Sequence, residues 1–156
     1  MHHVYDPVGK RVYLGDGKRV TVSSAPPLVR TLAEGAGYSL GGVDAAPDGS
    51  VYFGSGLGVR RVAPDGTTYA VASSGLDTVK DVAVHPSGDV YGIGGPRQLF
   101  RIHDLGGVTI LAEAALCSAL TEGALVSTTG LPSASALTVA PNGDLVVVTD
   151  CNRLLR

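Results

Sequence analysis

The sequence predicts an all-β chain, and three observations support this. An apolar stretch, a Pro-x-Gly turn and a second apolar stretch occur together four times, with the prolines at residues 7, 47, 86 and 141. The first two steps between prolines are 40 and 39 residues, and the third is 55. The 22 glycines and nine prolines suit many short strands joined by tight turns. A strand-rich repeat of about forty residues is typical of a β-propeller blade, so we expect a β-propeller.

Each repeat is expected to supply the four antiparallel strands of one blade. The repeats are predicted to span about residues 1–40, 41–77, 78–112 and 136–156. In the first two, apolar runs between turn signals predict strands at 2–5, 10–14, 19–23 and 28–33, then at 43–46, 51–54, 59–63 and 67–72. In the last two, strands are expected at 79–84, 89–93, 98–103 and 108–112, then at 136–140, 144–149 and from 153 onward.

The longer third step contains an insertion at residues 113–135. Its first part, 113–120, is compatible with two helical turns or with a loop rich in Ala, Ser and Thr. The fourth repeat reaches only its third strand, so the chain is expected to form about three and a half blades of a larger ring. The open ends are then predicted to meet the remaining blades of the same polypeptide, or to associate with one another.

The composition argues against several classes of partner. The formal net charge is −2, and aromatic residues make up only 5% of the chain. Binding to nucleic acid is therefore not expected, because it usually requires a basic surface. The apolar runs are too short to span a bilayer, and no membrane insertion is expected.

Turns and loops alternate between the two ends of the strands. The Pro-x-Gly turns lie at one end and are interpreted as purely structural turns between strands. The other end carries the variable loops and the insertion, and repeat proteins often bind through such loops. The binding residues predicted on that face are Asp16, Lys18, Arg97, Asp150, Asn152 and Arg153.

Cys117 and Cys151 fall in adjoining connections on the same predicted face. A disulfide between them would agree with an extracellular setting. Two free, partly buried thiols are the alternative, and the sequence leaves both open.

The inner strands offer little for catalysis or for a metal. Asp44 and Asp81 lie at different levels of the predicted channel, so each level has at most one carboxylate, whereas a hard cation needs about six oxygen ligands. We therefore expect no metal and no cofactor, and interpret both acids as turn or channel-solvated groups. His85 and His103 are interpreted as polar turn residues. Third-strand arginines are expected to cover blade edges with their long side chains.

The pattern V-x-x-A-P-D-G-x-V-Y, followed by a glycine-rich loop and an Arg-Val-rich strand, resembles an NHL-repeat propeller. The opening residues 5–17, YDPVGKRVYLGDG, resemble the start of the propeller region in teneurin-like and Rhs (YD-repeat) bacterial surface proteins. This resemblance implies a secreted or cell-surface location. It also implies a scaffold or recognition module that binds a protein or glycan partner.

The expected function is therefore a non-enzymatic recognition module that binds its partner through the loop-bearing face. The alternative is a propeller hydrolase or lyase, of lactonase type, that works through the central channel. The sequence contains no Gly-x-Ser-x-Gly, Cys-x-x-Cys or P-loop motif, and no catalytic residue is predicted.

Overall fold

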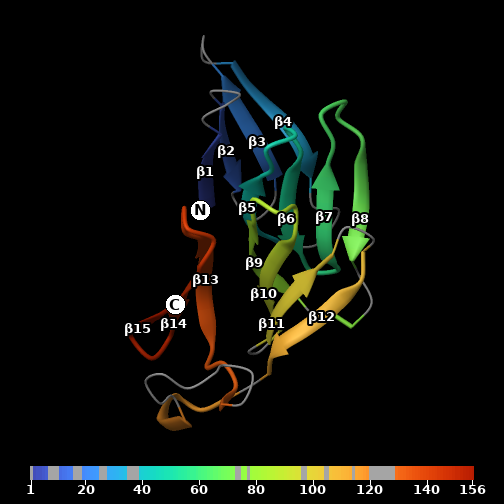
Figure 1. Cartoon of the computed structure of the whole chain (residues 1–156). Coiled ribbons are helices and arrows are strands. Elements are labelled where there is room, and N and C mark those ends of the chain that lie inside the picture. The colour runs from blue at the N-terminus through green and yellow to red at the C-terminus, as the bar shows by residue number, and fades with distance from the viewer. Residues whose placement is uncertain are drawn as a thin grey trace.

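The computed structural model contains four antiparallel sheets that follow one another along the chain (Figure 1). It describes residues 2–6, 11–15, 19–24, 28–34, 39–72, 75–76, 78–95, 98–103, 106–113, 115–119 and 129–156. We call the sheets blades one to four in chain order. The expected all-β fold with four-stranded blades is confirmed.

The first three blades have four strands each, and the described part of the fourth has three. The strands of blades one and two are β1 (His2–Asp6), β2 (Arg11–Gly15), β3 (Arg19–Ser24), β4 (Leu28–Glu34), β5 (Leu40–Ala45), β6 (Val51–Ser55), β7 (Gly58–Val62) and β8 (Thr68–Ala72). The strands of blades three and four are β9 (Val79–Val84), β10 (Val90–Gly94), β11 (Gln98–Ile102), β12 (Val108–Ala112), β13 (Ala134–Val139), β14 (Leu145–Thr149) and β15 (Arg153–Leu155).

The innermost strands of successive blades lie side by side. β1 contacts β5, β5 contacts β9, and β9 contacts β13. The blades are therefore arranged around an arc, with β5 and β9 near its middle (Figure 1).

Strand β5 begins earlier than the sequence predicts, at Leu40 instead of Val43. Its pairing with β6 shifts register between these two residues, across Gly41 and Gly42. A Cβ on Gly41 would come within 2.4 Å of the Val79 carbonyl oxygen. The two glycines, which precede the predicted strand, let β5 approach β9 closely.

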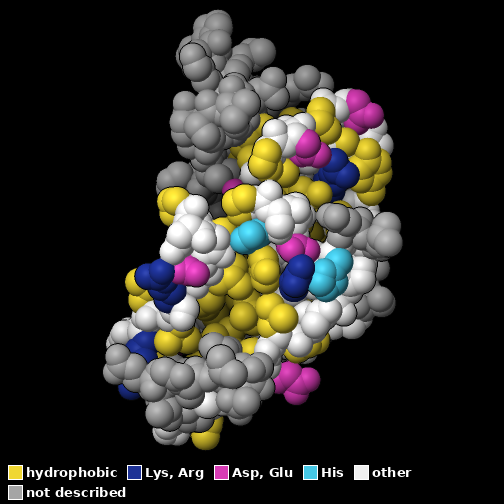
Figure 2. Space-filling view, in the orientation of Figure 1, with side chains coloured by type: hydrophobic (Ala, Val, Ile, Leu, Met, Phe, Trp, Pro, Cys, Tyr) yellow, Lys and Arg dark blue, Asp and Glu magenta, His cyan; other side chains and the backbone are white. Residues whose placement is uncertain are grey.

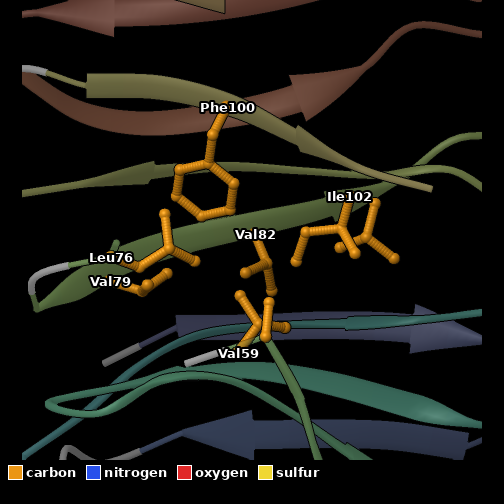
Figure 3. Close-up of a cluster of buried hydrophobic side chains, with 8 residues drawn as sticks. Val59, Leu76, Val79, Val82, Phe100 and Ile102 are labelled. Carbon is orange, nitrogen blue, oxygen red and sulfur yellow. The ribbon is translucent and has the colours of Figure 1, made fainter. Parts of the chain in front are cut away.

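Apolar side chains fill the space between neighbouring blades. Val59, Val82, Val90, Phe100 and Ile102 form the core between blades two and three (Figure 3). Comparable clusters lie between blades one and two and between blades three and four. Burying one such side chain contributes about 1.5–3 kcal/mol, so these clusters help to hold neighbouring blades together.

The insertion is attached to the blades at its two ends. Leu131 exchanges backbone hydrogen bonds with Glu113 and Ala115, and its side chain is 1% exposed within the core of blades three and four. The described part also contains a short 3-10 helix, η1 (Cys117–Ala119). A disulfide joins Cys117 to Cys151, with a Cα–Cα distance of 5.8 Å. No helix among the described residues is long and apolar enough to cross a membrane.

Candidate active site

The Pro-x-Gly turns of blades two, three and four close in the same way. In blade two, Gly49 N–H donates to the Ala46 carbonyl at 3.0 Å, and equivalent bonds close the other two turns. A Cβ on Gly143, in the blade-four turn, would lie 3.0 Å from the His85 ring in the blade-three turn. The turns therefore share one side of the molecule, which we call the turn face. The opposite side, with the β6–β7, β10–β11 and β14–β15 loops, is the loop face.

Each of these three turns carries an acid that pairs with an arginine at the third strand of its blade. Arg61 lies 2.8 Å from Asp48, and Arg101 lies 2.7 Å from Asp89. Arg156 pairs with Asp144 in the same way. Arg61 and Arg101 were expected to cover blade edges. In the structure they also fasten the turn to the third strand.

At two positions, blade three carries histidine where another blade carries alanine. The residue before the turn proline is Ala46 in blade two and Ala140 in blade four, but it is His85 in blade three. The residue after the third strand is Ala63 in blade two and His103 in blade three. Since alanine suffices at these positions elsewhere in the chain, the turns do not require histidine for folding.

One of these two histidines, His103, belongs to a group of polar side chains around Asp89. Its Oδ2 accepts hydrogen bonds from Arg101 Nη2 at 2.7 Å and from the Ser87 hydroxyl at 2.9 Å. Its Oδ1 lies 3.5 Å from His103 Nδ1. The other ring nitrogen, His103 Nε2, lies 3.2 Å from Thr109 Oγ1. We call these five residues the polar cluster. It places a hydroxyl, an imidazole and a carboxylate next to one another, and these are groups that general acid–base catalysis can use.

The electrostatics keep Asp89 charged. The hydrogen bond from Arg101 is the largest influence, and it lowers the pKa of the Asp89 carboxyl below its ordinary value of 3.8. Burial opposes this effect, while Ser87 and the charges of Arg101 and His103 add to it. A carboxylate beside Nδ1 favours the ring tautomer that carries its proton there.

The polar cluster borders a groove on the turn face between blades two and three. The groove has a volume of about 450 Å³, within the usual size range of small-molecule sites. Ser87 and His103 line its blade-three side, and Tyr52, Arg61 and Tyr69 line its blade-two side. Figure 2 shows adjoining acidic and basic side chains in several places on one face, with apolar surface between them.

The residues predicted to bind a partner are placed elsewhere or not described. Asp16, Lys18 and Arg97 lie outside the described residues. Asp150, Asn152 and Arg153 come together at the β14–β15 loop, where Asn152 has a left-handed φ of 56°. They are on the loop face, away from the groove, and their binding role stays a prediction.

Sequence reasoning gave the turn face no functional role, yet the groove lies there. It therefore missed Tyr52, Tyr69 and His103 as site residues. One available signal was the replacement of alanine by histidine in a single repeat, at residues 85 and 103.

The inner-strand acids have a different role from the one expected. Asp44 accepts hydrogen bonds from Ala45 N–H and, across the seam between blades two and three, from Val84 N–H at 2.7 Å. Asp81 is only 6% exposed and accepts from Val82 N–H and from Leu137 N–H in blade four at 2.9 Å. They are therefore not simply turn or channel-solvated groups, because each joins one blade to the next.

A divalent metal in the channel, as the lactonase alternative would imply, does not fit these two acids. Each of their four carboxylate oxygens already accepts a backbone hydrogen bond. Burial raises the pKa of Asp44, which further disfavours its charged form. Across the described part of the chain, no three His, Cys, Asp or Glu side chains gather into a group that could hold a metal ion.

Comparison with solved structures finds propellers. Virginiamycin B lyase from Staphylococcus aureus is similar over 99% of this chain and 53% of its own, with a TM-score of 0.68 and 12% identity. A gluconolactonase from Xanthomonas campestris matches over 98% and 59%, with a TM-score of 0.67 and 20% identity. A nidogen/laminin complex matches over 96% and 56%, with a TM-score of 0.71 and 19% identity. The fold is that of a partial β-propeller.

This chain spans a little over half the length of these structures. No protein-family model and no curated protein matches it. The NHL-type propeller is supported by the structural neighbours, whereas the finer resemblance to teneurin-like and Rhs proteins stays a prediction.

The expectation that the chain is not an enzyme is corrected by these comparisons. Similar structures include a lyase and a gluconolactonase, so the fold is one on which catalysis occurs. The expectation rested on the channel and on motifs within single segments, which do not exclude an enzyme with this fold. It did not consider residues that the turns bring together from separate strands.

Proposed function

We propose that this chain carries an acid–base site of a propeller enzyme that hydrolyses a small cyclic ester. The observation that carries the proposal is the position of His103 at the groove, between the carboxylate of Asp89 and the hydroxyl of Thr109. Virginiamycin B lyase and gluconolactonase, at low identity, support an enzyme with this fold. A lactone is the substrate class that the second of these names suggests.

In this proposal His103 acts as the general base. Asp89 holds the proton on Nδ1, which leaves the Nε2 lone pair for a water that takes the place of the Thr109 hydroxyl. The water oxygen bonds to the ester carbonyl as its proton passes to Nε2. The ring C–O bond then breaks, and the ring oxygen receives that proton.

The first prediction concerns His103→Ala. The chain should release acid from simple lactones such as glucono-δ-lactone, measured in a pH-stat, and the variant should lose at least about a hundredfold of the rate. Alanine already occupies the equivalent position in blade two, at Ala63, so the variant should fold and give an unchanged circular dichroism spectrum.

The matched control is Asp144→Asn, which alters the acid–arginine pair of blade four, away from the groove. It should keep the wild-type rate. Mass spectrometry of the product identifies the reaction, because hydrolysis adds one water whereas elimination leaves the mass unchanged. Equal rates for wild type and His103→Ala would exclude His103 as the base.

We also propose a secreted or cell-surface location, because the Cys117–Cys151 disulfide suits an oxidising compartment.

A further inference from the structure

The blade-two wall of the groove is a row of side chains on three adjacent strands. Tyr52 on β6 pairs across the sheet with Arg61 on β7, and Arg61 pairs with Tyr69 on β8. All three line the groove. The Arg61 guanidinium carbon lies 5.7 Å from the centre of the Tyr52 ring. The row therefore presents two phenol rings with a planar cation between them.

The hydrogen bonds of Arg61 are directed within its own blade. Its Nη2 donates to Asp48 at 2.8 Å, and its Nε and Nη2 both donate to the Ser50 hydroxyl. The pair of Arg61 and Asp48 has no net charge. The row is thus suited to stacking more than to attracting a charged group.

The exposure of the row supports the same use. Tyr69 is 42% exposed and the Arg61 side chain is 32% exposed, so both are open to a ligand in the groove. The groove is also lined by Val90 and Ile102, which belong to the core between blades two and three. The site therefore offers flat, partly apolar surfaces on this wall.

The row occurs in blade two and not in blade three. The equivalent positions in blade three pair Tyr91 with Arg101 and Arg101 with Thr109. The outer tyrosine is thus replaced by threonine, as expected if Tyr69 serves this groove and is not needed by the blade fold.

We propose that the Tyr52–Arg61–Tyr69 row binds an aromatic ring of the ligand. Stacked rings and cation–π contacts favour an aromatic ring over a saturated ring of similar size. His103 lines the same groove, so the ring would be part of the ester substrate. Only this last step rests on the proposed function.

The test uses two inert ligands, 3-phenylpropanoate and 3-cyclohexylpropanoate, which share charge and chain length and differ in aromaticity. Isothermal titration calorimetry on the full chain should show the phenyl compound binding about fivefold more tightly. Tyr69→Thr, which copies blade three, should remove most of this preference. Tyr69→Phe keeps the ring and should retain it.

Equal affinity for the two ligands would overturn the inference, as would an equal loss of preference in Tyr69→Phe and Tyr69→Thr. These readouts do not depend on catalysis. A phenyl preference without lactone hydrolysis would sustain the aromatic site and refute the proposed function. Hydrolysis of lactones without a phenyl preference would sustain the proposed function and refute the aromatic site.

Discussion

Asp81 connects three blades through one side chain. Its Oδ2 accepts a hydrogen bond from the Leu137 backbone amide of blade four. A Cβ built on Gly42 of blade two would lie only 1.6 Å from Asp81 Oδ1. Gly42 is therefore needed for the space it leaves, because any side chain there would displace a buried, hydrogen-bonded carboxylate.

The second prediction is that Gly42→Ala lowers the free energy of unfolding by about 1–3 kcal/mol through overpacking. Chemical denaturation followed by circular dichroism measures it. Gly107→Ala is the control, since a Cβ there meets nothing within 4 Å, and it should change stability by less than about 0.5 kcal/mol. Similar losses in both variants would contradict the packing around Asp81.

The third prediction concerns pH and Asp89. The Arg101 hydrogen bond lowers the pKa of this carboxyl in the folded state below its ordinary value of 3.8. Such a carboxyl stabilises the protein at pH values above its unfolded-state pKa. This stabilisation is lost as the pH falls through the lower, folded-state pKa.

Asp89→Asn should therefore reduce stability near neutral pH and weaken its dependence on pH below about 4. Thermal unfolding at pH values from 2 to 7 measures both effects. Asp144→Asn removes a carboxyl whose pKa is likewise lowered by an arginine, Arg156, and should change the curve in the same direction. A curve for Asp89→Asn that is parallel to wild type at every pH would argue against the pairing with Arg101.

At the scale of elements, the insertion is held by its disulfide and by the backbone bonds of Leu131. Cys117 and Cys151 are 34 residues apart in sequence, so the bond closes a loop that includes β13 and β14. Such a cross-link stabilises mainly by restricting the unfolded chain.

The fourth prediction is that replacing both cysteines by serine lowers the free energy of unfolding by about 2–4 kcal/mol. Denaturant titrations of wild type with and without reductant, beside the double variant, provide the measurement. Reduced wild type should match the variant. Identical curves for the variant and non-reduced wild type would mean that the disulfide does not form.

Strand positions were predictable because the turn chemistry is local. Each Pro-x-Gly turn needs only its own residues, and Gly49, Gly88 and Gly143 take the positive φ that such turns favour. The start of β5 was not predictable in this way, because the two glycines that shift its register are explained by β9, nearly forty residues later.

At the scale of the whole molecule, the site was harder to predict than the fold. The polar cluster combines residues from a turn, from β11, from the end of that strand and from β12, and the groove adds a wall from the neighbouring blade. Neither has a continuous sequence motif. The sequence did contain one signal, which appears when the repeats are aligned. Blade three has histidine at residues 85 and 103, where other blades have alanine.

The two seam carboxylates, Asp44 and Asp81, both belong to the earlier blade of their pair, while the amides they bind, at Val84 and Leu137, belong to the later one. At both of these seams the side-chain acceptor therefore comes from the earlier blade and the backbone donor from the later one, so two carboxylates link the inner strands of three successive blades in chain order.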